Sequence, residues 1–247
     1  MKKEVVIGIG LVALIVASAT GYYFGYDIGF EKASKIDTIS YNPVINPADF
    51  VPQVDNKYLT LTPGKKFVFE KKTGEGVERI EVIVSKETRQ VMGVTTTVVW
   101  DRVWLNDQLI EDTKDWYAQD KEGNVWYFGE EVDNYEDGKL KDHQGAWEAG
   151  VDGALPGIIM KADPQVGDSY KQEYYKGQAE DMADIVALDQ KVSVPYGKFE
   201  DCLQTRDWSQ IDKSVNEFKY YCPEVGFVVL EKTIDGSERL ELLRVST

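Results

Sequence analysis

Carboxylates dominate the residues of this 247-residue chain that could do chemistry, because Asp and Glu outnumber Lys and Arg by 43 to 28. The single histidine, His143, lies between Asp142 and Gln144 in an acidic stretch. A Ser-His-Asp triad needs that ring beside a nucleophile, and the sequence has no Gly-x-Ser-x-Gly elbow to present one. It also has no phosphate-binding glycine motif of the Walker or dinucleotide type. We therefore predict that the protein uses no cofactor.

The carboxylates suggest two kinds of site. The acidic stretch at 130–142 could supply hard oxygen ligands for calcium, with Glu130, Glu131 and Asp133 as candidates, although its spacing is not that of an EF-hand loop. A solvated hairpin tip explains the same residues. A glycosidase-like pair needs two carboxylates facing each other across an aromatic-lined cleft, and Glu148 with Asp152 is the pair that the sequence offers. We predict no metal site and no catalytic residue, and keep both sites as alternatives.

The stretch 145–160 combines a tryptophan, spaced glycines and the apolar run Ile-Ile-Met. Loops are usually polar, so an apolar loop either folds over the core or lines a pocket. We interpret it as a loop anchored by Trp147, and a ligand pocket beneath it is the alternative. The candidate ligand-binding residues for that pocket are Trp116, Trp126, Tyr127, Phe128, Trp147, Ile158 and Met160.

The chain contains two cysteines, Cys202 and Cys222. In an oxidising compartment they could pair across neighbouring strands and close a loop of about twenty residues, a link worth roughly 3 kcal/mol. A redox pair is disfavoured because the sequence has no Cys-x-x-Cys spacing. We predict a structural disulfide.

The N-terminal stretch from Val5 to Tyr26 contains no charged side chain, and Lys2 and Lys3 precede it. It is long enough to cross a bilayer as one helix. The two lysines favour a cytoplasmic N-terminus and an exported C-terminal part, so we predict a single-pass cell-membrane protein. Secretion after cleavage near Ala19 is the alternative.

Small residues recur every fourth position along this predicted helix. Such a stripe lets two backbones approach closely, which predicts self-association or a partner helix, although Gly and Ala are also common in membrane helices. The stripe consists of Ala13, Ala17, Gly21, Gly25 and Gly29.

Three segments follow from the composition: an anchor at 1–35, an extended linker rich in Pro and Asn at 36–57, and an extracytoplasmic β domain at 58–247. Within the domain, β-branched and aromatic runs alternate with turn signals such as Asp137-Gly138 and Asp235-Gly236. We predict a mostly β fold, an antiparallel curved sheet or an open barrel or sandwich. Residues 179–188 fit another strand or a short helix, and we favour the strand.

Several motifs occur in one order between about residues 58 and 245: DWYAQD at 115–120, GNVWYFGE at 123–130, WEAGVDGALPGIIM at 147–160, VPYGKF at 194–199 and YYCPEVGF at 220–227. They resemble a family of uncharacterised exported or membrane-anchored prokaryotic proteins rich in β structure. The resemblance implies export and no particular reaction. The second half also looks like the curved sheets of lipoprotein-carrier-like domains, which is a likeness of fold alone.

A net charge of −15 disfavours binding to nucleic acid. We therefore expect a membrane-anchored domain that binds or scaffolds rather than catalyses. One alternative is a carrier or sensor of an apolar ligand beneath the 145–160 loop. The other is a hydrolase of envelope polymers that uses paired carboxylates.

Overall fold

The computed structural model describes residues 41–247. The predicted membrane helix, the cleavage position near Ala19 and the stripe of small residues lie outside the described residues. Within 41–247, no helix has both the length and the apolar character needed to span a bilayer.

The described part of the chain is built almost wholly of strands, as predicted. After a short 3-10 turn, η1 (Pro47–Asp49), the strands are β1 (Phe50–Val51), β2 (Lys66–Lys72), β3 (Val77–Val91), β4 (Val94–Leu105), β5 (Gln108–Asp120), β6 (Val125–Glu136), β7 (Lys139–Asp142), β8 (Trp147–Glu148), β9 (Leu155–Met160), β10 (Ser169–Lys171), β11 (Glu173–Tyr174), β12 (Asp181–Val194), β13 (Gly197–Ser209), β14 (Asn216–Cys222), β15 (Phe227–Thr233) and β16 (Arg239–Ser246).

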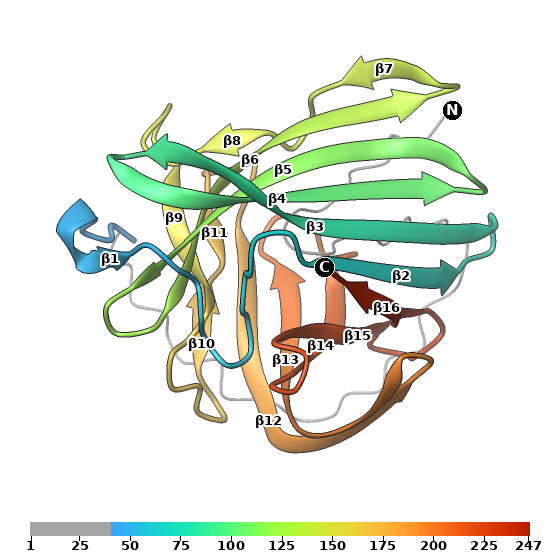
Figure 1. Ribbon diagram of the computed structural model, residues 1–247. Helices are drawn as coiled ribbons and strands as arrows, with labels where there is room; N and C mark the ends of the chain where they lie inside the picture. The colour runs from blue at the N-terminus through green and yellow to red at the C-terminus, as the bar shows by residue number, and fades with distance from the viewer. Residues whose placement is uncertain (1–40) are drawn as a thin grey trace.

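All these strands pair antiparallel in one curved sheet, which runs in the order β10-β12-β13-β14-β15-β16-β2-β3-β4-β5-β6-β9-β11. The two ends of that order, β10 and β11, are separated in the chain only by Gln172. Residues 169–174 therefore act as one bent connection that pairs with β12 through its first half and with β9 through its second. This connection brings the two sides of the sheet together into a nearly closed, barrel-like form (Figure 1).

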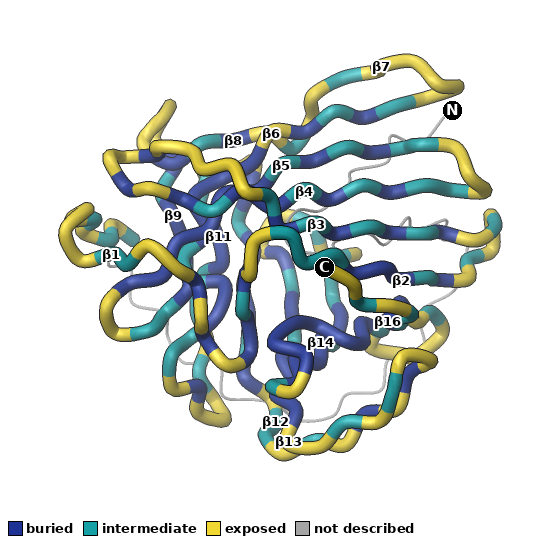
Figure 2. Tube along the Cα trace, viewed as in Figure 1, coloured by how far each residue is buried: buried dark blue, intermediate teal, exposed yellow. Residues whose placement is uncertain are grey.

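The alternation of side chains along the strands fills one part of the interior with apolar groups. Ile80 and Val82 on β3 are buried, and Glu81 between them is not. Leu240 and Leu242 on β16 follow the same rule, as their sequence pattern predicts. Figure 2 shows buried and partly exposed residues alternating along β2 to β6. This apolar part includes the stacked rings of Phe67 and Phe227, whose centroids lie 4.1 Å apart.

The predicted linker packs against the sheet over its described part. Phe50 of β1 pairs with Asp120 at the end of β5, and Val54 is buried. The backbone N–H groups of Asp55 and Asn56 both donate to the Gln119 amide oxygen at 2.9 Å. Prolines keep the segment extended, and these contacts hold its backbone polar groups against the strands.

The 145–160 stretch is not the loop that its glycines predict. It contributes β8, which pairs with β6, and β9, which lies between β6 and β11. The apolar run at its end is β-forming and sits within the sheet, so the turn is confined to 149–154. By contrast, residues 179–188 fall largely within β12, which confirms the strand that we favoured.

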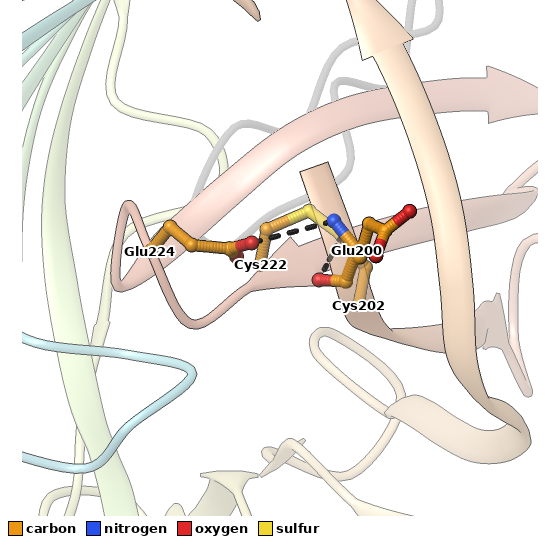
Figure 3. Close-up of a disulfide and its surroundings, with 4 residues drawn as sticks. All are labelled: Glu200, Cys202, Cys222 and Glu224. Carbon is orange, nitrogen blue, oxygen red and sulfur yellow. Dashed lines mark hydrogen bonds between the residues drawn. A yellow bond between two sulfur atoms is a disulfide. The ribbon is translucent and has the colours of Figure 1, made fainter. Parts of the chain in front are cut away.

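Cys202 and Cys222 form a disulfide, as predicted. They lie on neighbouring strands, one register step from the Leu203–Tyr221 pair of β13 and β14. Beside the disulfide the backbone N–H of Glu200 donates to a carboxylate oxygen of Glu224 at 3.3 Å (Figure 3). A covalent link here ties β14 to β13 and is typical of proteins that fold in an oxidising compartment.

Candidate functional site: two carboxylate clusters inside the sheet

Polar side chains occupy the rest of the interior. On β5, the inward alternation places Glu111, Thr113, Asp115, Tyr117 and Gln119 in buried positions. The same pattern on β13 to β15 buries carboxylates and a lysine. Since a buried charge without compensation is strongly disfavoured, the partners of these groups decide what the interior can do.

The first group, the lysine cluster, consists of Asp207 on β13, Glu217 and Lys219 on β14, and Glu231 on β15. The Lys219 Nζ lies 3.3 Å from Asp207 Oδ2, 3.3 Å from Glu217 Oε1 and 3.8 Å from Glu231 Oε2. Burial by itself lowers the pKa of Lys219, but the three carboxylates outweigh it and hold that pKa well above its usual value. The cluster is an ion network with its cation built into the chain.

A second lysine serves another part of the interior. Lys71 Nζ on β2 lies 2.9 Å from Glu78 Oε2 and 3.6 Å from Glu238 Oε2. Burial raises the pKa of Glu78, and the Lys71 ammonium opposes that rise. Here too a cation of the chain faces the buried acid.

The second group, the tyrosine cluster, contains Asp115 and Tyr117 of β5, Tyr127 and Glu130 of β6, Trp147 of β8 and Glu173 of β11. The Tyr127 hydroxyl donates to Asp115 Oδ1 at 2.8 Å. The Tyr117 and Tyr127 rings stack with centroids 4.9 Å apart. The Trp147 ring meets the Tyr127 ring edge-on at 5.3 Å. Each of the three carboxylates therefore has an aromatic residue beside it: Tyr127 beside Asp115, and Trp147 beside Glu130 and Glu173.

Several polar atoms of the tyrosine cluster are buried without a regular hydrogen bond to any described residue. They are both carboxylate oxygens of Glu173, Oε1 of Glu130, the Tyr117 hydroxyl and the Trp147 indole nitrogen. Among residues 41–247, no Lys, Arg or His forms an ion pair with Asp115, Glu130 or Glu173. The Trp147 indole and the Asp181 backbone N–H still act on the Glu173 carboxylate, and the Tyr117 hydroxyl acts on Asp115, through contacts that lack regular hydrogen-bond geometry. Buried polar atoms are normally well satisfied, so this group of weakly satisfied atoms is unusual.

Burial is the first cause of the altered acidity in this cluster. It raises the pKa of Asp115 to about 7, although the Tyr127 and Tyr117 hydroxyls oppose the rise. Burial also raises the pKa of Glu130 well above its usual value, and the charges of Asp115 and Glu173 raise it further. The pKa of Glu173 rises for the same reason, with Asp181 adding to it and the Trp147 indole opposing it. These acids therefore keep protons at pH values where exposed Asp and Glu side chains are ionised.

Two glycines allow the strands that carry this cluster to approach closely. A Cβ on Gly157 of β9 would lie 2.3 Å from the Gln172 backbone, and one on Gly129 of β6 would lie 2.3 Å from the Trp147 carbonyl oxygen. The close approach at Gly157 places Glu173 next to β9. The approach at Gly129 seats Trp147 opposite Glu130.

The bent connection at Gln172 joins the two clusters. Its backbone N–H donates to the Asp181 carbonyl oxygen at 2.8 Å, and its Nε2 lies 3.2 Å from Asp207 Oδ2 of the lysine cluster. Glu173, the next residue, belongs to the tyrosine cluster. The acidic interior is thus continuous across the seam that closes the sheet.

The structure divides the aromatic residues that we predicted to line a pocket. Tyr127 and Trp147 meet in the tyrosine cluster. Trp116 instead contacts Arg89, whose guanidinium lies 4.0 Å from the centroid of the Trp116 ring. Trp126 and Phe128 pack against Phe50 of β1. On β9, Met160 is fully buried and Ile158 is partly exposed.

The two carboxylates of the hydrolase alternative lie away from the buried clusters. Glu148 Oε2 lies 2.6 Å from the Arg89 guanidinium, in a partly exposed ion pair. Asp152 is exposed in the 149–154 turn, where its φ is 50°.

The calcium candidates are separated by the strand on which they lie. Glu130 is buried in the tyrosine cluster, whereas Glu131 is exposed and lies 3.8 Å from the Lys114 ammonium. Asp133 Oδ1 is 2.8 Å from His143 Nδ1. Alternation prevents Glu130 from joining its neighbours in one site. Within the described residues, no group of three or more His, Cys, Asp or Glu side chains is arranged to hold a metal ion.

Sequence reasoning missed Asp115, Tyr117 and Glu173 as site residues. The alternation along β5 carries a signal for Asp115 and Tyr117, because polar residues occupy every second position of the strand. To use it one must know which face of the sheet points to the interior, and both faces of β5 are polar. Glu173 offers no comparable pattern, since its place follows from the bend at Gln172.

No protein-family model matches the chain, and no curated protein is similar enough to be a relative. The predicted β-rich character agrees with the fold, and no family is established for the chain. One solved structure, a "putative lipoprotein" from Parabacteroides distasonis, is similar over 76% of this chain and 98% of its own, with 11% identity and a TM-score of 0.42.

Proposed function

We propose that the protein is an exported, membrane-held binding protein whose β domain takes up a small polar ligand in the tyrosine cluster. The observation that carries the proposal is the set of buried polar atoms there that lack both a regular hydrogen bond and a cation of residues 41–247 beside them. The Cys202–Cys222 disulfide supports an extracytoplasmic location, because such bonds persist in oxidising compartments. The apolar stretch 5–26 would supply the membrane attachment.

The chemistry of the interior favours a polar ligand over the apolar ligand of the carrier alternative. Beneath Trp147 lie carboxylates and phenols, and an apolar ligand would leave them without partners. The hydrolase alternative is disfavoured because the Glu148 carboxylate is already paired with Arg89.

A thermal-denaturation panel tests this function. The full-length chain in nonionic detergent is heated with small organic cations, neutral polyols or small carboxylates. At least one class should raise the melting temperature of the wild type and of Glu200→Gln, whose carboxylate is exposed. The same class should have no effect on Glu173→Gln. A panel in which no class raises the melting temperature, or in which Glu173→Gln responds equally, would refute the proposal.

We also propose that the stripe of small residues associates with a second helix in the membrane. Replacing Gly21 and Gly25 by Ile would block close backbone contact, so chemical cross-linking in membranes should decrease. Replacing Leu11 and Val12 by Ile provides the control, and equal cross-linking in both variants would argue against the stripe.

A further inference from the structure

The two clusters both bury three carboxylates but differ in what compensates them. Each holds three buried carboxylates, on the neighbouring strands β13, β14 and β15 in the lysine cluster and on β5, β6 and β11 in the tyrosine cluster. In the lysine cluster the Lys219 ammonium lies within 3.8 Å of all three. In the tyrosine cluster, no cation of residues 41–247 forms an ion pair with the carboxylates, and the Glu173 oxygens have only neutral donors, the Trp147 indole and the Asp181 backbone N–H, in contacts without regular hydrogen-bond geometry.

We infer that the tyrosine cluster binds the ammonium group of a small organic cation, in the role that Lys219 fills in the other cluster. This inference rests on the proposed function and names its ligand class. Ammonium groups prefer carboxylate acceptors and also bind at aromatic rings; Tyr117, Tyr127 and Trp147 are the rings of this cluster, with Tyr117 and Tyr127 stacked on each other through one face. An anion would face three carboxylates, and a neutral polyol would leave the acids protonated and gain no charge pairing from them.

Proton release should accompany binding. Without a ligand, the raised pKa values of Asp115, Glu130 and Glu173 mean that the cluster retains protons at neutral pH. An arriving ammonium favours the charged carboxylates, so it displaces those protons and binds more tightly as the pH rises. The other titratable groups facing the cluster are Asp101, Glu111, Tyr117, Tyr127, Asp181 and Tyr221.

Isothermal titration calorimetry of the full-length chain in nonionic detergent tests the inference with matched head groups. The probes are methylammonium and butylammonium, methanol and butanol, acetate and butyrate, and calcium chloride. We expect the ammonium compounds to bind, with affinity rising about tenfold between pH 6 and pH 8. The heat should depend on the ionisation enthalpy of the buffer, because protons are released.

The variants complete the design. Glu173→Gln should weaken ammonium binding about tenfold or more, whereas the exposed Glu200→Gln should leave it unchanged. If the alcohols, the anions or calcium bind and the ammonium compounds do not, the ligand class is wrong and the binding function stands. If none of the probes binds, both the inference and the proposed function fail. Ammonium binding that is unchanged in Glu173→Gln would also overturn the inference.

Discussion

The lysine cluster and the tyrosine cluster show two ways of burying three carboxylates in one sheet. The lysine cluster uses three adjacent antiparallel strands, whereas the tyrosine cluster adds Glu173 of β11 to the adjacent strands β5 and β6, and Gln172 connects the two clusters. In the first, Lys219 supplies a permanent positive charge. In the second, raised pKa values let protons neutralise the acids. The permanent cation makes the first cluster structural, whereas protons can be exchanged, which leaves the second able to accept a charge from outside the chain.

The largest effect should follow the removal of the built-in cation. Lys219→Met keeps a side chain of similar length but leaves three buried carboxylates uncompensated, and we expect a loss of about 3–5 kcal/mol in the free energy of unfolding at pH 8. Urea denaturation measures it. The loss should shrink at pH 5, where the acids can protonate. Lys191→Met, which removes an exposed pair with Glu200, should have little effect, and equal losses in the two variants would remove the distinction.

The disulfide stabilises the strands that carry the lysine cluster. It closes a loop with a sequence separation of 20, and the double variant Cys202→Ala/Cys222→Ala should lose about 3 kcal/mol through the entropy of the unfolded chain. Urea denaturation again gives the value. On non-reducing gels the wild type should migrate faster than its reduced form, and the variant should show no such difference. Identical mobility of the oxidised and reduced wild type would contradict the disulfide.

On the side of the tyrosine cluster, the close approach at Gly157 can be tested alone. Gly157→Ala forces a Cβ to within 2.3 Å of the Gln172 backbone, so β11 and Glu173 must move. We expect a loss of about 1–3 kcal/mol from overpacking, measured by urea denaturation. Gly74→Ala is the matched control, because a Cβ there meets nothing within 4 Å. Equal losses of unfolding free energy in Gly157→Ala and Gly74→Ala would show that β9 and the Gln172 backbone are not in close contact.

An effect of opposite sign should appear when a proton-bearing acid is replaced by its neutral amide. Burial holds the pKa of Asp115 at about 7 in the folded state against an ordinary 3.8, so the folded protein keeps a proton that the unfolded chain releases. This acid therefore makes stability fall as the pH rises from about 4 to about 7. Asp115→Asn should be similar to wild type at pH 4 and more stable at pH 8, by up to about 4 kcal/mol for the full pKa shift.

Denaturation series across pH measure this effect. In the Asp115→Asn variant the Tyr127 hydroxyl can still donate to the side-chain amide oxygen, so the geometry is conserved and charge is the variable that changes. A stability loss with rising pH that is the same in wild type and variant would show that Asp115 is not the proton carrier.

Local sequence patterns specify the strands, the turns and the disulfide of this protein. Alternation such as Ile80-Glu81-Val82 identifies strands, Asp137-Gly138 supplies a turn that tolerates positive φ, and two cysteines without a redox spacing predict a disulfide. These signals are local, because they depend on side chains a few residues apart. The stretch 145–160 misled for the same reason, since its glycines serve close contacts with distant strands and not a loop alone.

The tertiary structure alone decided which acids share a site. Asp115, Glu130 and Glu173 come from three strands, and they meet because residues 169–174 bend at Gln172 to close the sheet. The curvature of the sheet turns one polar face of β5 toward the interior. The sequence of β5 does not show which face that is, because both faces are polar. Whether a buried carboxylate has Lys219 beside it is likewise a matter of register between strands. Charge compensation acts through space over a few ångströms, whereas sequence patterns report only neighbours along the chain.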